Sequence, residues 1–307
     1  MKYLFVLSQE NIELAREEVL SIVKPKKYTF IDHYMLLEKT TKKVYNLAYT
    51  KKIIKLFFIS TKNTFEKDIN SYGWKIEKPY AVRCYGKLSE RKVASLIWKK
   101  IRDPRINLKY PQVIINCINI KDKIYTGQQT FENKENFNLR KSHLRPKTTG
   151  NSLHPKLARC MVNLCGDKQI LDPFCGTGGI LIEAGLMGYK VKGCDIDEIS
   201  LEKAKVNLQH YNIKNNQLLN IDATRLNFKM KNIVTDMPYG KSSKVTNTLD
   251  ELYSAFFKNM RNKLVGKAVV ALPNYIKYQK YIKDYKIKNI FKFYLHKNLT
   301  KIILILE

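Results

Sequence analysis

The chain has 307 residues, of which 44% are hydrophobic, and its formal net charge is +29. This composition allows two domains with hydrophobic cores. No apolar stretch approaches ~18 residues, and the N-terminal apolar run is short and soon followed by acidic residues. We therefore expect a soluble, cytoplasmic protein without a membrane segment or signal peptide. The charge indicates a polyanionic partner, nucleic acid by default, although a general bias toward lysine remains the alternative.

The first 71 residues predict a small ferredoxin-like domain. An N-terminal apolar strand is followed by an amphipathic helix over Asn11–Val23, and residues 28–39 form one or two strands. Residues 41–60 then predict a helix that runs into a strand. This β-α-β-β-α-β order is typical of the ferredoxin-like sandwich.

A second unit is predicted over residues 72–131. A strand at 78–86 precedes a helix that begins at Ser89 and Glu90, a good start signal, and two strands at 112–120 and 123–131 flank the turn Lys-Asp-Lys. Basic residues, tyrosines and a tryptophan are spread over this unit. Each one alone fits an ordinary solvated face, but together they predict an RNA-facing surface.

Residues 132–151 are polar, charged and without periodicity, which predicts a linker. From residue 152 to 307 short apolar strands alternate with helical patterns. The strand segments are QILD, KVKGCD, LLNID, NIVTD and KAVVALP, and the helical patterns lie at Gly178–Gly188, Ser200–Tyr211 and Thr248–Lys263. The alternation predicts an α/β fold with a doubly wound, mainly parallel sheet, completed by a C-terminal β-hairpin.

A glycine-rich turn, Asp172-Pro-Phe-Cys-Gly-Thr-Gly-Gly179, joins the first of these strands to its helix. Glycines allow the backbone to approach a ligand closely, although tight helix–strand packing alone would also require them. The spacing is neither the dinucleotide fingerprint nor a phosphate loop, so neither NAD nor ATP is favoured.

Acidic residues end the next two strands. Asp195 lies 19 residues after Gly176, where a carboxylate can bind the two hydroxyls of a ribose; Asp197 is more consistent with a helix cap. Asp222 can bind an adenine amino group or cap a turn, and its position does not separate these two roles. Together with the glycine turn, these acids describe a pocket for an adenosyl ligand without a triphosphate, which S-adenosylmethionine fits best.

The fourth strand ends in Asp236-Met237-Pro238-Tyr239-Gly240. The exocyclic amine of a nucleobase is a poor nucleophile, because its lone pair is delocalised into the ring. The Asp236 carboxylate and the Met237 carbonyl can accept its N–H groups, Pro238 can hold them rigidly, and Tyr239 can stack on the base. We therefore interpret this segment as an amine-methylating site that acts chiefly by positioning, in preference to an ordinary loop.

These motifs, with the stretches RKSHLRP and SLHPKLARCMVNL before them, resemble the archaeal tRNA guanine-N2 methyltransferases that act at position 10. The resemblance implies a THUMP RNA-binding domain over 72–131 that holds tRNA near its acceptor end, and a class I methyltransferase domain over 152–307. It implies S-adenosylmethionine as cofactor, tRNA as partner and a monomer, and leaves open a small activating subunit. The implied cofactor-binding residues are Asp172, Phe174, Gly176, Thr177, Gly178, Asp195, Ile196, Asp222 and Ala223.

Two departures from the family pattern concern Met237, where the family usually has proline, and the less aromatic linker. Because position 237 contributes a backbone carbonyl, we expect activity to survive. Another guanine N2, an adenine N6, or a non-catalytic tRNA-binding role remain alternatives. The six cysteines form no CxxC pair, so no metal site is expected. A pyrimidine C5 methylase with a cysteine nucleophile is disfavoured, because no Pro-Cys pair lies at the end of the fourth strand.

Overall fold

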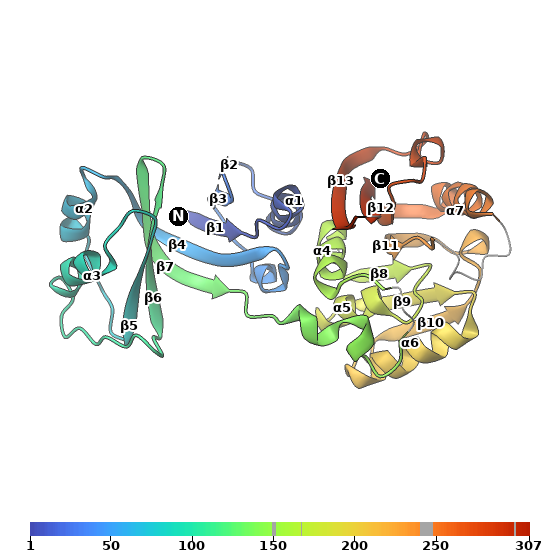
Figure 1. The fold of residues 1–307 in the computed structure, drawn as a ribbon, viewed down its shortest axis with the longest axis horizontal. Coiled ribbons are helices and arrows are strands. Elements are labelled where there is room, and N and C mark those ends of the chain that lie inside the picture. Colours follow the sequence, from blue (N-terminus) through green and yellow to red (C-terminus); the bar gives the residue numbers. More distant parts are fainter. Residues whose placement is uncertain (149–151, 167, 240–247, 298) are drawn as a thin grey trace. The chain divides into compact units, whose positions relative to one another are not determined.

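The computed structural model describes residues 1–148, 152–166, 168–239, 248–297 and 299–307, which form two compact units (Figure 1). Each unit is built on its own sheet of seven strands. The first unit contains Met1–Ile12, Val23–Tyr45 and Thr50–Lys134. The second unit contains Glu13–Ile22, Asn46–Tyr49 and Glu135–Glu307.

The first unit has one mixed sheet in the order β2-β3-β1-β4-β7-β6-β5. The strands are β1 (Tyr3–Leu7), β2 (Tyr28–Ile31), β3 (Tyr34–Leu37), β4 (Thr50–Thr61), β5 (Tyr80–Tyr85), β6 (Val113–Ile120) and β7 (Lys123–Glu132). Strands from both predicted N-terminal domains therefore share a single sheet, with β4 paired to β7. The boundary predicted at residue 71 falls at the end of helix α2 (Phe65–Ser71), within this unit.

Helices α2 and α3 (Glu90–Trp98) pack on the sheet through a shared apolar cluster. The start of α3 follows the sequence prediction, because the Ser89 side chain accepts a hydrogen bond from the Lys92 N–H at 3.3 Å. The helix predicted at the start of residues 41–60 is only a short 3₁₀ helix, Lys42–Asn46, in which Val44 is the buried residue. One buried side chain does not provide the apolar stripe that a longer helix needs.

Helix α1 (Ile12–Val23) contributes its central residues to the second unit. The fully buried Glu18 accepts hydrogen bonds of 2.8 Å from the N–H groups of Ala48 and Tyr49. It also accepts one of 2.7 Å from Asn163 Nδ2. These bonds join the helix and the segment Asn46–Tyr49 to the second unit, an assignment that the sequence pattern did not predict.

The second unit has the predicted doubly wound sheet, in the order β10-β9-β8-β11-β12-β14-β13. Its elements are α4 (Pro155–Cys165), β8 (Gln169–Asp172), α5 (Gly179–Leu186), β9 (Lys190–Asp195), α6 (Glu198–His210), β10 (Asn216–Asn220), β11 (Met230–Asp236), α7 (Leu249–Lys263), β12 (Leu264–Pro273), β13 (Ile287–His296) and β14 (Leu299–Leu306). Strands β8 to β12 pair in parallel, and β13 and β14 form the predicted antiparallel hairpin. Among the described residues, no helix is both long enough and apolar enough to cross a membrane.

The two faces of this sheet are covered by different helices. Ile233 on β11 and Val270 on β12 pack with α7 in one apolar cluster. Because side chains alternate along a strand, the buried Val234 and Val269 face the opposite side. Helix α4 contacts β11 and β12, and its almost completely buried residues account for that second layer.

The described part of the predicted linker belongs to the second unit from Glu135 onward and carries two 3₁₀ helices, Phe137–Arg140 and Ser142–Leu144. Arg140 and Arg159 both pair with the fully buried Glu183 of α5, at 2.7 and 2.9 Å. Residues 135–148 therefore pack against the domain that follows, and their polar composition reflects a buried ionic cluster.

Candidate active site

The candidate site lies at the carboxyl ends of the parallel strands of the second unit. The chain runs from β8 outward to β9 and β10, and then returns to β11 on the other side of β8. The reversal of direction between β8 and β11 makes a topological switch point, the usual ligand crevice of such sheets. Asp172, Asp195 and Asp236 end β8, β9 and β11.

The glycine-rich turn after β8 depends on glycine at two positions. Gly176 and Gly178 have φ angles of +50° and +85°, in the left-handed region that other residues rarely adopt. A Cβ atom on Gly176 would meet no atom within 4 Å, so this part of the turn borders open space. The Gly176 N–H donates a hydrogen bond of 2.7 Å to Asp195, which links the turn to the end of β9.

Asp195 and Ile196 present one polar and one apolar group at the end of β9. The Asp195 carboxylate also accepts the Asp197 N–H at 3.0 Å, and burial raises the pKa of its carboxyl group. The Ile196 side chain is 55% exposed, which is high for a large apolar residue beside a sheet. A partly buried acid next to open backbone and an exposed apolar side chain can hold an adenosyl group. Asp197 occupies the N-cap position of α6, as predicted.

The remaining predicted cofactor residues differ in accessibility. Asp222 accepts hydrogen bonds of 2.8 Å from both the N–H and the hydroxyl of Thr224, so its carboxylate acts as a turn cap. Ala223 and Thr177 are buried, with exposed fractions of 4% each. Phe174 is half-buried and makes an edge-on contact with the ring of Phe256.

Asp172 is buried beneath the turn. Its Oδ1 accepts hydrogen bonds from the Thr235 hydroxyl at 2.7 Å and the Phe174 N–H at 3.2 Å. Burial raises the pKa of its carboxyl group from 3.8 to about 7, and the nearby Asp195 and Asp236 add to the rise. Asp172 therefore connects the turn after β8 to the end of β11.

The motif at the end of β11 is held by side chains that the sequence did not single out. The Asp236 carboxylate forms an ion pair with Lys301 of β14, whose side chain is fully buried. The Lys301 Nζ lies 3.7 Å from the centroid of the Tyr239 ring. The Tyr253 hydroxyl of α7 donates a hydrogen bond of 2.8 Å to the Pro238 carbonyl. Gly240, the last residue of the predicted motif, is outside the described residues.

Met237 is anchored by both its backbone and its side chain. Its N–H donates a hydrogen bond of 2.9 Å to the Ala271 carbonyl of β12, and its fully buried side chain belongs to the apolar cluster under α7. A proline could not make this hydrogen bond. With the side chain in the core, the polar group that Met237 can offer a substrate is its backbone carbonyl.

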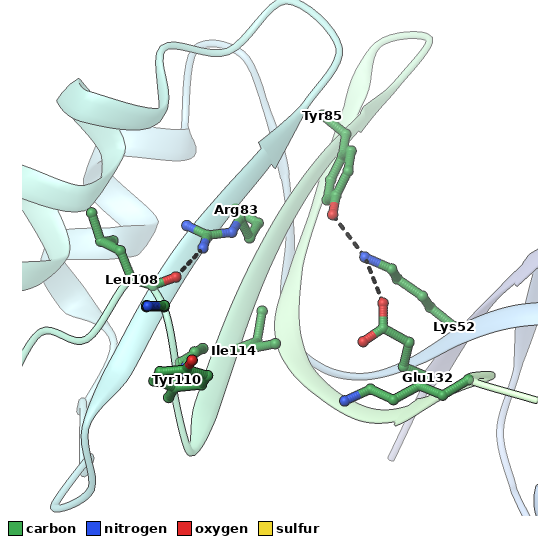
Figure 2. A pocket seen from close by; sticks show the side chains of 10 residues that line it. Lys52, Arg83, Tyr85, Leu108, Tyr110, Ile114 and Glu132 are labelled. Atoms are coloured by element: carbon green, nitrogen blue, oxygen red, sulfur yellow. Dashed lines mark hydrogen bonds and ion pairs between the residues drawn. The ribbon is translucent and has the colours of Figure 1, made fainter.

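The first unit contains a basic pocket of about 470 Å³, shown in Figure 2. It is lined by Lys52, Arg83, Tyr85, Leu108, Lys109, Tyr110, Pro111, Ile114, Glu132 and Lys134. Tyr110 is 71% exposed, and the Lys109 Nζ lies 5.3 Å from its ring centroid. Lys52 donates a hydrogen bond to the Tyr85 hydroxyl at 2.9 Å. Exposed rings among cationic side chains suit stacked bases and backbone phosphates.

The residues that the structure describes include no group of three or more His, Cys, Asp or Glu side chains that could hold a metal ion. All six cysteines have free thiols, and five are buried. Burial raises the pKa of Cys194 to about 11 and raises that of Cys175 as well. Both side chains behave as small packing groups beside the candidate site.

Comparisons with known proteins find methyltransferases. The family of the RMKL-like methyltransferase domain matches residues 142–302. A tRNA (guanine(10)-N2)-dimethyltransferase of Methanothermobacter thermautotrophicus is 34% identical over 337 aligned residues, which cover 100% of this chain and 99% of the relative. The enzyme of the same name from Pyrococcus abyssi is 41% identical over 184 residues, or 55% of this chain and 54% of that protein.

Among solved structures, TrmN from Thermus thermophilus aligns with a TM-score of 0.56 over 100% of this chain and 99% of its own. Their sequences are 16% identical, so this likeness concerns the fold. The match over the full length of the Methanothermobacter protein carries more weight, because it includes both units. The chain belongs to the family of tRNA (guanine(10)-N2)-dimethyltransferases.

Proposed function

We propose that this protein transfers methyl groups from S-adenosylmethionine to the exocyclic N2 amine of a guanine in tRNA, at position 10, giving mono- or dimethylguanosine. The observation that carries the proposal is the arrangement at the switch point, where the glycine turn after β8 adjoins the Asp-Met-Pro-Tyr segment after β11. The names of the relatives supply the target nucleotide.

In the proposed reaction, Asp236 and the Met237 carbonyl accept hydrogen bonds from the guanine amine. These bonds return electron density to nitrogen and aim its lone pair, which is positioning catalysis. Tyr239 stacks on the base, and the Tyr253 hydroxyl steadies the loop through the Pro238 carbonyl. The amine loses a proton once it carries the new methyl group, so Asp236 can accept that proton without acting as a base beforehand.

The bound cofactor would supply the electrophilic methyl group of a sulfonium. The open backbone at Gly176, next to Gly178 in the same turn, would border it, Asp195 would bind its ribose hydroxyls, and Ile196 would pack on its adenine. Asp222, which caps a turn in this structure through Oδ1, would accept the adenine amino group with Oδ2. The other predicted residues, Asp172, Phe174, Thr177 and Ala223, would support this pocket.

We assign tRNA binding to the first unit, with residues 1–71 as its ferredoxin-like part and 72–131 as its THUMP part. The basic pocket around Tyr110 supports this assignment, because its cations and rings suit an RNA backbone with unstacked bases. The target guanine would leave its stack to reach the second unit. We also propose that the protein acts as a cytoplasmic monomer.

A direct test uses the purified chain, tritiated S-adenosylmethionine and a tRNA transcript with guanosine at position 10. The matched control is the same transcript with inosine at that position, which differs only in lacking the N2 amine. We expect incorporation into the guanosine transcript alone, and nucleoside mass spectrometry should identify N2-methylguanosine and N2,N2-dimethylguanosine.

Each alternative has its own signature in this experiment. Equal incorporation into both transcripts would move the reaction to another nucleotide, and N6-methyladenosine would identify an adenine target. If tRNA binds but no methyl is incorporated, even with a small partner subunit supplied, the chain is a binding protein. Activity of the chain alone would show that no activating subunit is required.

A further inference from the structure

We propose that Lys301 is a positioning residue of the methyl-transfer site, whose buried ammonium group holds the Asp236 carboxylate and the Tyr239 ring in the geometry that receives the amine. The inference rests on the proposed function, because it gives Lys301 a task in that reaction. Lys301 lies 65 residues after Asp236 along the sequence and is not part of the Asp-Met-Pro-Tyr motif.

The burial of Lys301 calls for a physical explanation. Its side chain is 0% exposed, and it directly precedes the apolar residues Ile302–Leu306 of β14. An ammonium group is expensive to remove from water unless it is paired, and a well-packed apolar residue would commonly serve stability as well or better. Buried charges in a crevice are instead typical of functional sites.

Within the part of the chain that the structure describes, the Lys301 ammonium has two contacts with the predicted catalytic segment. One is the ion pair with Asp236, and the other is the contact with the face of Tyr239, 3.7 Å from the ring centroid. A cation over an aromatic face is attracted to the ring quadrupole, especially where water is excluded. Because Lys301 covers one face of Tyr239, a base can stack only on the other, so the lysine also fixes the side from which guanine approaches.

The ammonium also favours the ionised form of Asp236, which is the form that the amine requires. Burial raises the pKa of the Asp236 carboxyl group, and Lys301 opposes that rise. An ionised carboxylate accepts hydrogen bonds with both oxygens, whereas a protonated one would present a donor to the amine. Around Asp236, the charged or titratable groups on the described elements are Asp172 of β8, Tyr239 of its own loop, Tyr253 of α7 and Lys301 of β14, while Tyr275 after β12 acts on Tyr239 and Tyr253.

Two variants of Lys301 separate its charge from its hydrogen bond to Asp236. Lys301→Met removes the charge and the hydrogen bond, while Lys301→Gln keeps an amide that can still donate to Asp236. Lys267→Met is the matched control, since Lys267 lies on β12, is 30% exposed and pairs with Glu307 at 3.9 Å. For each full-length variant, kcat and KM are measured from pH 5 to 9, and the Asp236 carboxyl carbon is titrated by ¹³C NMR, with Asp236→Asn for assignment.

We expect both Lys301 variants to move the Asp236 titration, and with it the acidic limb of kcat, upward by about one to three pH units. The KM for S-adenosylmethionine should stay within about twofold, because Lys301 acts on the amine and not on the cofactor. The control should match the wild type. Lys301→Gln keeps the test valid if Lys301→Met is too unstable to purify.

An unmoved Asp236 titration in either variant would overturn the inference, as would a loss of activity that appears equally in Lys267→Met. Lys301 variants that raise KM and leave kcat unchanged would also overturn the inference, since Lys301 would then contribute only to ground-state binding. The NMR titration needs no turnover. If the wild type transferred no methyl group, the proposed function would be refuted. If the wild type were active and the Asp236 titration did not move in the variants, only the inference about Lys301 would be refuted.

Discussion

Asp172→Asn should make the second unit more stable at neutral and alkaline pH but not at acidic pH. Asp172 is 2% exposed, and its pKa rises from 3.8 to about 7. Both of its hydrogen bonds, from the Thr235 hydroxyl and the Phe174 N–H, end on Oδ1. Asparagine presents a carbonyl oxygen at the same place, so the variant can keep both bonds without carrying a charge.

The size of the effect follows from the pKa of Asp172. A rise from 3.8 to about 7 corresponds to roughly 4 kcal/mol, at about 1.4 kcal/mol per pH unit. Because the folded pKa is the higher one, the folded chain binds the proton more tightly, and stability falls as pH increases from about 4 to about 7. Above that window both states are ionised and the loss is complete. Asparagine does not ionise, so the free energy of unfolding of Asp172→Asn should exceed that of the wild type by near zero at pH 4 and by a few kcal/mol at pH 8.

The assay must report on the second unit, because both tryptophans, Trp74 and Trp98, belong to the first. Hydrogen exchange followed by mass spectrometry gives opening free energies for peptides of β8 and β11 at each pH, after correction for intrinsic exchange rates. Asp284→Asn is the control, because it removes the same charge from an exposed pair with Arg261. Exposed pairs contribute only about 0.2–1 kcal/mol.

A difference between wild type and Asp172→Asn that stayed constant from pH 4 to pH 8 would refute the reasoning. The same would follow if the variant were less stable at pH 8, since the lost carboxylate would then have been stabilising. A pH-dependent gain in Asp284→Asn of similar size would assign the effect to net charge instead of the Asp172 site.

Two further predictions concern function. Asp236→Asn should lower kcat by about 10²–10³-fold and leave tRNA affinity unchanged, as measured by single-turnover transfer and filter binding; an equal loss of both would contradict its assigned role. Tyr110→Ala should weaken tRNA binding by about 1–3 kcal/mol if the ring stacks on a base, whereas Tyr28→Ala, an exposed ring outside the pocket, should not. Lys109→Gln should reduce the slope of log affinity against log salt by about 0.7–0.9 if it contacts a phosphate; an unchanged slope would exclude that contact.

The architecture of the second unit could be predicted because its signals are local. Strands that alternate with helices, the Thr248 capping box at the start of α7 and the glycine turn each depend on residues close in sequence. The segment 135–148 was harder to interpret, because its polarity alone is typical of a linker. The half-buried Arg140 pairs with Glu183, 43 residues later, and a single sequence gives no sign of that partner.

The sequence predicted the motifs of the candidate site but not the side chains that hold them in place. Asp172, Asp195 and Asp236 could be found because each ends an apolar strand. Lys301 was not singled out, because it belongs to no motif and is one of many lysines in this basic chain. One local signal was present: Lys301 directly precedes the apolar run of β14, and a charge beside a buried strand at the ligand end of a sheet is a candidate for a pairing partner.

The position of β14 explains why a C-terminal hairpin can serve the reaction. Strand β12 lies between β11 and β14, with Ala271 paired to Asp236 and Pro273 paired to Lys301. The Met237 N–H bonds to the Ala271 carbonyl, so β12 fixes the backbone of the motif. Lys301 reaches the same segment from the far side of β12 and fixes its side chains. The first restraint depends on the register of β11 with β12, and the second depends also on the register of β12 with β14. A shift in the pairing of β12 with β14 would therefore separate Lys301 from Asp236 without altering any residue of the motif.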